Sequence, residues 1–425
     1  MGISMNGGFQ RRVVVSGLGV ISPSGLNLRE FWDAVRGGHC PFRKVTRFKA
    51  GDLPARIAAE IQGFNPGSYL EHKKIKRFGL AIQYAIAAAK EAVRDAGIQL
   101  DQVDADRLGV VEATSLGGID NTLKGHLEFL DGGYRAINPY VFINAYCGGG
   151  SGELAYEIGA KGFALTYCSG SASGNDAIGH AFKLLQGDEA DVILVGGSEA
   201  PLIEPLWHGL CLTKVMTRHS GDPRHAMKPY DRQRDGFVLG EGAAYLVLEE
   251  LTHALARGAR IYAEIRGHGR SCEAYDSVTP HPEGAGLYRA MAKALGQARL
   301  AASEIDYINT HGTATKLNDI AETVAIKKAF ANHLRQLAVS STKPVTGHLL
   351  GAAGALETVI CALAIHHQAI PPTINLSDPD EGFDLDYVPG QSRPYPIRLA
   401  MNLNVGFGGK NSCLILGRYD PPPPP

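Results

Sequence analysis

The chain has 425 residues, of which 44% are hydrophobic and 20% charged, and its formal net charge is −1. This balance is typical of a globular protein and indicates neither a nucleic-acid partner nor a membrane surface. The apolar runs are short and interrupted, residues 1–10 lack the apolar core of a signal peptide, and the seven cysteines show no zinc spacing. We therefore expect a cytoplasmic protein with no metal and no other cofactor.

Short apolar segments alternate along the chain with longer segments of helical periodicity. We expect strands at 11–18, 108–113, 162–168, 191–196, 244–248, 261–267, 305–309 and 337–340, and a closing pair at 403–409 and 412–416. Helices are expected at 27–37, 78–96, 153–160, 177–185, 287–298, 319–329 and 351–366. Residues 40–70, rich in proline and charge, are expected to cross the surface. The alternation predicts an α/β fold with mostly parallel sheets covered by helices on both faces.

The second half of the chain repeats the rhythm of the first, and the two meet near residues 250–260. This predicts a duplicated α/β unit, with one half at 1–255 and the other at 256–418. The remaining residues, 419–425, end in five prolines and are expected to form a disordered tail.

The stretch 162–187 combines an apolar run, a Ser/Gly cluster at 169–174 and a helical pattern that stops at Gly187. This pattern predicts a strand, a sharp turn and a buried helix. Such a turn presents a side chain at a helix N-terminus, where unpaired N–H groups and the helix dipole favour developing negative charge. It is therefore a natural position for a nucleophile.

Four other motifs resemble those of the β-ketoacyl-acyl-carrier-protein synthases of the thiolase-like fold, and they occur in that family's order. They are R-D-G-F-V-L-G-E-G-A at 234–243, I-N-T-H-G-T-A-T-K-L-N-D-I-A-E at 308–322, V-S-S-T-K-P-V-T-G-H-L-L-G-A-A-G-A-L-E at 339–357 and N-V-G-F-G-G-K-N at 404–411. The resemblance covers about residues 10–418 and is nearest to the fatty-acid synthase II type and to the ketosynthase subunits of dissociated polyketide systems. It implies a layered α-β-α-β-α arrangement of two mixed or parallel sheets.

The family's nucleophile is a cysteine, but this chain matches the family without a gap only if Ser171 takes that position. Placing the nucleophile on Cys168 would require three extra residues, and a side chain turns by about 100° per residue in a helix. A helix N-terminus brings a thiol close to ionisation at neutral pH but leaves an alcohol protonated. Ser171 is then an engineered replacement or a natural departure, and Cys168 stays open as an alternative nucleophile.

The resemblance assigns roles to eight more residues. His311 and His348 would hold the enolate oxygen that malonyl decarboxylation creates. Lys343 and Glu322 would form a buried charge pair that orients the two histidines, and Thr313 and Thr315 would bind the pantetheine arm of the carrier. Phe407 resembles the family's gating phenylalanine, and Gly408 beside it would also contact the substrate. The backbone N–H of Phe407 would complete an oxyanion hole with the backbone N–H of residue 171. The G-F-G-G stretch precedes a strand, which argues against a phosphate loop.

Two classes of function follow from the resemblance. The first is a synthase that condenses an acyl thioester with malonyl-acyl-carrier protein, impaired by serine at the nucleophile. The second is a non-condensing partner subunit similar to a chain-length factor, or a malonyl-carrier decarboxylase. Retention of His311, Lys343 and His348 favours the first. The expected partners are an acidic acyl carrier protein, with Lys73, Lys74, Lys76 and Arg77 as candidate contacts, and a second subunit in a homodimer or a heterodimer with a chain-length factor.

Overall fold

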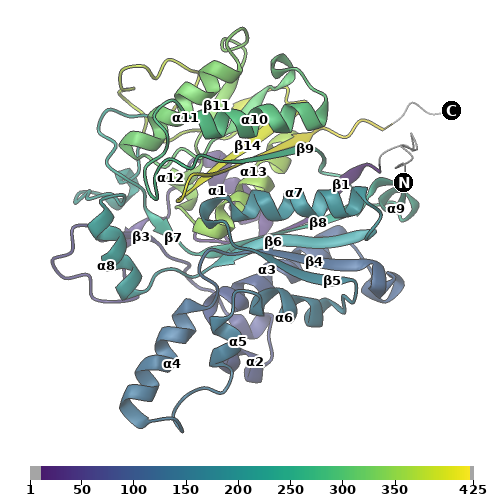
Figure 1. Cartoon of the computed structure of the whole chain (residues 1–425), viewed down its shortest axis with the longest axis vertical. Coiled ribbons are helices and arrows are strands. Elements are labelled where there is room, and N and C mark those ends of the chain that lie inside the picture. Colours follow the sequence, from purple (N-terminus) through teal and green to yellow (C-terminus); the bar gives the residue numbers. More distant parts are fainter. Residues whose placement is uncertain (1–10, 422–425) are drawn as a thin grey trace.

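In the computed structural model, which describes residues 11–421, ten strands form one continuous sheet (Figure 1). The first half of the chain contributes β1 (Val13–Ile21), β4 (Leu108–Ala113), β5 (Phe163–Tyr167), β6 (Val192–Glu199) and β8 (Gly242–Glu250). The second half contributes β9 (Ala263–Cys272), β10 (Tyr307–Asn309), β11 (Ala338–Ser340), β14 (Leu399–Gly406) and β15 (Lys410–Gly417). The strand order is β11-β10-β14-β15-β9-β1-β8-β6-β4-β5.

The two halves have the same topology. Counted along the chain, the five strands of each half pair in the same way. The first strand is antiparallel to the fifth, and the fifth is antiparallel to the fourth. The fourth strand is parallel to the second, and the second is parallel to the third. The halves join where Val13–Val15 pairs with Ala263–Ile265. The duplication expected from the sequence is therefore confirmed, but the sheets are mixed rather than mostly parallel. One reason is the short turn 407–409 between β14 and β15, which is too short for a parallel crossover.

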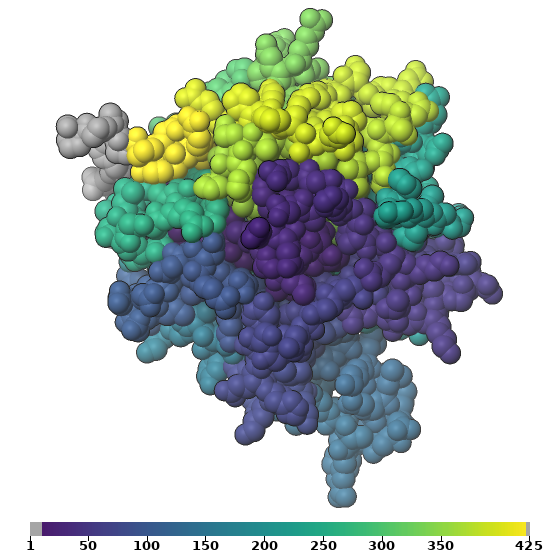
Figure 2. All heavy atoms as spheres, turned by 180° about the vertical axis from the view of Figure 1, so that it is seen from behind, coloured from purple at the N-terminus to yellow at the C-terminus, as the bar shows by residue number. Residues whose placement is uncertain are grey.

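Helices form three layers around the strands. The middle layer consists of two helices, α7 (Ser173–Gln186) and α13 (Ala353–His367), which lie between the halves (Figure 1). The outer face of the first half carries α3 (Leu80–Ala96) and α6 (Gly149–Ile158), and that of the second half carries α10 (Ala285–Ala298) and α11 (Lys316–Ala329). The layered α-β-α-β-α arrangement is confirmed. In the space-filling view from behind, the second half occupies the top and the first half the bottom (Figure 2).

The two central helices approach each other closely at their N-termini. A Cβ on Gly174 of α7 would lie 2.4 Å from the backbone nitrogen of Ala355 on α13, so only glycine fits there. By length and composition, Leu350–His367 is apolar enough to cross a membrane, but 83% of it is buried inside the fold. It is apolar all round because it is a core helix. The close contact brings the N-terminal turns of α7 and α13 together.

Several elements, most of them short, were not expected from the sequence. The helices among them are α2 (His72–Arg77), α4 (Ile119–Gly132), α5 (Val141–Ala145), α8 (Glu204–Thr213), α9 (Leu251–Ala256) and α12 (Lys343–Thr346); the predicted helix at 27–37 is α1 (Leu28–Gly37). The strands are β2 (Arg43–Lys44), β3 (Ile57–Ala59), β7 (Leu239–Gly240), β12 (Ala369–Ile370) and β13 (Arg393–Pro394). Residues 40–70 do not simply cross the surface, because β3 is buried beside β7.

Two predictions concern the ends and the boundary of the halves. The aromatic ring of Tyr419 lies 5.6 Å from the Arg12 guanidinium, so the tail is anchored at its start. Residues 422–425 of the predicted disordered tail lie outside the described residues. The predicted boundary between residues 255 and 256 falls near the end of α9 and stays a prediction.

Candidate active site

A cavity of about 320 Å³ opens between the two halves, large enough for a small-molecule site. The first half contributes Ser171 to its wall, and the second half contributes His311, His348 and Phe407. Residues from both halves therefore meet in one site. The remaining lining residues are Thr213, Lys214, Val215, Asp235, Phe237, Glu273, Val278, Thr279, Pro280, Thr313, Thr315, Lys316, Leu317, Asn318, Leu350, Val405, Gly406 and Gly409.

Ser171 lies in a single 3-10 turn, Gly170–Ala172, between the end of β5 and the start of α7. Gly170 has a φ of +63°, which favours glycine. The Ser173 hydroxyl accepts a bond from the Ser169 N–H and donates to the Gly170 carbonyl, at 2.8 and 2.6 Å. This small network fixes the turn and directs Ser171 toward the second half. Its Oγ lies 3.1 Å from His348 Nε2.

Cys168 is placed differently. Its side chain is exposed, and its Sγ lies 3.4 Å from the Ser115 carbonyl oxygen. Desolvation, with Cys147 and Glu199 nearby, raises the pKa of this thiol and disfavours the thiolate. Cys168 does not line the cavity that holds the two histidines. The geometry therefore supports Ser171 at the nucleophile position.

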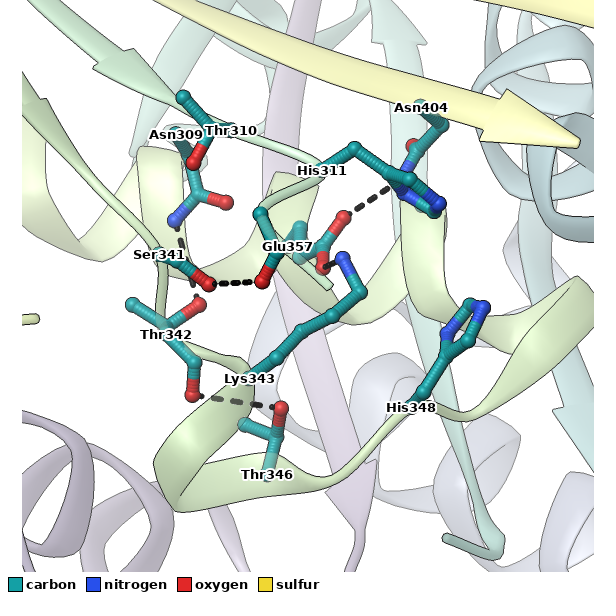
Figure 3. Close-up of polar contacts among 12 residues, drawn as sticks. Asn309, Thr310, His311, Ser341, Thr342, Lys343, Thr346, His348, Glu357 and Asn404 are labelled. Carbon is teal, nitrogen blue, oxygen red and sulfur yellow. Dashed lines mark hydrogen bonds and ion pairs between the residues drawn. The ribbon is translucent and has the colours of Figure 1, made fainter. Parts of the chain in front are cut away.

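The two histidines come from different loops and converge on one side of the cavity (Figure 3). His311 follows β10 and His348 follows α12. Their ring centroids are 5.2 Å apart and their planes nearly perpendicular. Burial, and then the charge of Lys343, lowers the pKa of both imidazoles well below the usual value. Both rings are therefore neutral at pH 7, and each can donate one N–H to an oxygen in the cavity.

The contact between Ser171 and His348 does not make an effective nucleophile and base. A serine needs a base that can hold its proton, and in catalytic triads a carboxylate on the far ring nitrogen stabilises the resulting imidazolium. Within residues 11–421, His348 Nδ1 is buried and has no hydrogen-bond partner. The nearby Lys343 charge opposes protonation further. The site therefore presents a hydroxyl to an imidazole that is a poor proton acceptor.

Lys343 does not pair with Glu322, so that prediction is wrong. Its Nζ contacts the carboxylate of Glu357 on α13, and both side chains are buried (Figure 3). The other Glu357 oxygen accepts a 2.6 Å bond from Asn404 Nδ2. Glu322 instead accepts the backbone N–H groups of His311 and Gly312, at 2.7 and 2.8 Å. The reason is that α11 packs Glu322 beneath the 311–312 loop, whereas α12 directs Lys343 toward α13.

Sequence profiles decide the family. The profile of the Beta-ketoacyl synthase N-terminal domain matches residues 10–254, and that of the C-terminal domain matches residues 262–377. The chain belongs to the β-ketoacyl synthase family. It is 41% identical over 409 residues to a 3-oxoacyl-[acyl-carrier-protein] synthase 2 of Coxiella burnetii, with 96% of this chain and 99% of the relative covered. A Synechocystis protein of the same name is 40% identical over 96% of this chain and 99% of its own.

Solved ketosynthase structures share the fold. The ishigamide ketosynthase/chain length factor matches with a TM-score of 0.89 and 35% identity, over 97% of this chain and 100% of its own. A β-ketoacyl synthase from Burkholderia phymatum matches with the same TM-score and 31% identity, over 96% and 100%. A ketosynthase in complex with its type II polyketide acyl-carrier protein also matches with that score at 31% identity, over 97% and 100%. The expected thiolase-like ketosynthase fold is confirmed.

Of the residues that the family resemblance assigns to the substrate, three line the cavity and one does not. The hydroxyls of Thr313 and Thr315 lie 3.0 Å apart on the wall, and Phe407 is 46% exposed at the mouth. Gly406 lies against the nucleophile turn, since a Cβ there would be 3.2 Å from the Ser171 nitrogen. Gly408 is not on the wall. Its N–H donates to the Ser277 carbonyl at 2.8 Å.

The basic stretch expected to receive the carrier is not at this cavity. Lys73, Lys74, Lys76 and Arg77 belong to α2, which does not contribute to the cavity wall. Lys74 is already paired with Glu153 and Glu157 on α6. The cations on the wall are instead Lys214 and Lys316. Across residues 11–421, no three His, Cys, Asp or Glu side chains are grouped to hold a metal ion.

Sequence reasoning missed Glu357, although it is the one acidic residue in the apolar helix α13. A lone carboxylate on a buried helix needs a buried partner, and this requirement could have identified it. We expect Glu357→Gln to lower the free energy of unfolding by about 2 kcal/mol, because Lys343 keeps a hydrogen bond but loses its counter-charge. Urea unfolding monitored by circular dichroism would measure this. Glu304→Gln, at an exposed turn, is the control, and equal stability of both variants would contradict the pairing.

Proposed function

We propose that the chain is a β-ketoacyl-acyl-carrier-protein synthase that carries out decarboxylative Claisen condensation on carrier-bound thioesters. One observation supports this most strongly: the Ser171 hydroxyl and two neutral, buried imidazoles converge in a single cavity between the duplicated halves. Family membership and the relatives named as 3-oxoacyl-[acyl-carrier-protein] synthase 2 agree with it.

In the first step, Ser171 Oγ attacks the acyl thioester carbonyl, and the carrier thiol leaves with a proton. In the second, malonyl-carrier loses CO₂, and the electron pair moves onto the thioester oxygen. The N–H groups of His311 and His348 hold that enolate oxygen. The enolate carbon then attacks the acyl ester on Ser171, which gives 3-oxoacyl-carrier and releases the serine oxygen, and a proton from solvent water restores its hydroxyl. We assign the backbone N–H groups of residues 171 and 407 to the oxyanion of both acyl-transfer steps.

Serine limits this cycle in its first step but not in decarboxylation. Decarboxylation depends on the imidazoles, which burial and the charge of Lys343 keep neutral. This favours malonyl-carrier decarboxylase as the second candidate function. A subunit that only binds a partner would not need two intact imidazoles facing the cavity. We place the reaction in the cytoplasm.

We also propose a dimer through the edge strand β5, with either a second copy or a chain-length factor as the partner. Strand β5 pairs with β4 alone, and its Leu165 is 38% exposed. Below α6, which packs on β5, lie α5 and α4, and α4 extends from the body of the fold (Figure 1). They carry exposed Leu127, Leu130 and Phe142, which would be buried against the partner.

The test supplies the chain with malonyl-carrier and acyl-carrier and measures released CO₂ and 3-oxoacyl-carrier. Condensation predicts both products, with the 3-oxoacyl product formed slowly. CO₂ alone would assign the chain to the decarboxylase function. Release of neither product, from a folded protein, would overturn both.

A further inference from the structure

A buried cluster of polar side chains lies behind the nucleophile turn. Its centre is Asp176 in the first turn of α7, a helix that packs against β9 and β15 of the second half (Figure 1). The other members of this Asp176 cluster are Ser169, His268 and Ser412. Asp176, His268 and Ser412 are each less than a tenth exposed. None of the four residues lines the cavity, so none of them can touch a substrate bound there.

The two oxygens of Asp176 bind groups from different halves of the chain. Oδ2 accepts the hydroxyl of Ser169 at 2.7 Å, and Ser169 directly precedes the turn that carries Ser171. Oδ1 accepts the hydroxyl of Ser412 on β15 at 2.8 Å. Because Ser412 donates its only proton to Asp176, its oxygen accepts from Nε2 of His268, 3.1 Å away on β9. The carboxylate therefore connects the nucleophile turn to two strands of the second half.

The cluster is closely packed and carries a charge. A Cβ on Gly179, farther along α7, would lie 2.1 Å from Cγ of the His268 ring, so only glycine fits there. Burial alone would raise the pKa of Asp176, but the hydrogen bonds from the other three side chains outweigh this effect and lower it below its usual value. Asp176 is therefore ionised at pH 7. Hydrogen bonds to an ionised acceptor are strong, so the carboxylate holds the connected elements firmly together.

The two N–H groups assigned to the oxyanion also come from different halves. Residue 171 lies in the turn before α7, and residue 407 lies in the turn between β14 and β15. The two turns touch, since a Cβ on Gly170 would lie 3.9 Å from the backbone nitrogen of Phe407. Ser169 precedes Ser171 in the first turn, and Ser412 lies on the strand that follows the second. The Asp176 cluster therefore connects the elements that carry the two donors.

We propose that Asp176 is a positioning residue whose carboxylate fixes the N–H groups of Ser171 and Phe407 relative to each other and so preorganises the oxyanion hole for acyl transfer. The inference rests on the proposed function, because it takes those two N–H groups as the oxyanion donors. Donors that are fixed in advance stabilise a developing charge without reorganising when it forms. His311 and His348 hold the enolate separately, so decarboxylation does not depend on the Asp176 cluster.

The test compares acyl loading with decarboxylation in the full chain carrying Ser171→Cys, in which loading is expected to be fast enough to time. Ser169→Ala and Ser412→Ala each remove one of the two connections to the carboxylate. We expect either change to slow loading from saturating acyl-carrier about tenfold, to leave the KM for acyl-carrier unchanged, and to leave CO₂ release from malonyl-carrier unchanged. Because both serines act through one carboxylate, the double variant should lose little more than either single variant.

The matched control is Ser16→Ala, which removes a buried hydroxyl on β1 away from the cavity and should change neither rate. Asp176→Asn, which keeps the shape of the side chain but removes its charge, is the second variant if the serine variants fail to fold, and it should show the same difference between the two rates. Unchanged loading in folded variants, equal losses of loading and decarboxylation, or single effects that multiply in the double variant would overturn the positioning role and leave the proposed function intact.

A measurement independent of activity separates the two failures. If the Ser171→Cys chain takes up no acyl group and releases no CO₂, the proposed function fails. Amide hydrogen exchange in residues 168–172 and 405–409 of the unmodified chain and of the variants then decides the connection. Faster exchange of both segments in either serine variant supports it, and exchange equal to that of the unmodified chain refutes it.

Discussion

Replacing Ser171 with cysteine is expected to raise the rate of acyl loading roughly 1000-fold, because a thiol here needs no strong base. The turn at the start of α7 favours a thiolate, whereas a serine alkoxide requires a proton acceptor. His348 lies 3.1 Å from the hydroxyl, but burial and Lys343 lower the pKa of its imidazole well below normal. The imidazole is therefore a weak base and a poor acceptor of the serine proton.

The measurement is the intact mass of the chain and of its Ser171→Cys variant at intervals after mixing with acyl-carrier protein. A rapid increase by one acyl group is expected only for the variant. Adding Cys168→Ala to the variant is the control and should leave loading intact, because Cys168 does not line the cavity. Equal loading of chain and variant, or loss of loading with Cys168→Ala, would contradict the placement of the nucleophile.

Replacing either His311 or His348 with alanine is expected to slow malonyl-carrier decarboxylation about 100- to 1000-fold, the usual cost of removing one preorganised oxyanion donor. The effect is independent of residue 171, because the enolate forms before carbon–carbon bond formation. Both rings are neutral and buried, so each offers its N–H without competition from water. Removing both should cost less than the product of the two single effects, since the rings act on one oxygen.

Release of CO₂ from malonyl-carrier, followed for each variant, would measure this loss. His333→Ala, outside the cavity in the turn after α11, is the control and should retain full activity. A variant lacking His311 or His348 that decarboxylates at the original rate would remove that imidazole from the proposed mechanism. Circular dichroism of each variant separates loss of chemistry from loss of fold.

Much of the local structure could be read from the sequence because it depends on neighbouring residues. The apolar run at 108–113 is β4 with the same limits, and the pattern at 78–96 is α3 to within two residues. The Ser/Gly cluster before α7 predicted a turn, and matching it to the family without a gap placed Ser171 rather than Cys168 at that position. The number of residues between two positions of a turn is given by the sequence, so Ser171 could be placed without knowledge of any tertiary contact.

What the sequence by itself determined was therefore the elements, the motifs and the family; only the tertiary structure decided which side chains meet. Lys343 pairs with Glu357 rather than Glu322 because of how α12 and α13 pack, and no spacing encodes that packing. Helix α11 is the clearest case. Its pattern would place Leu317, Ile320 and Val324 in the core, yet they face solvent and its carboxylates are buried. The buried backbone N–H groups of His311, Gly312 and Tyr230 need acceptors, and Glu322 and Asp319 supply them.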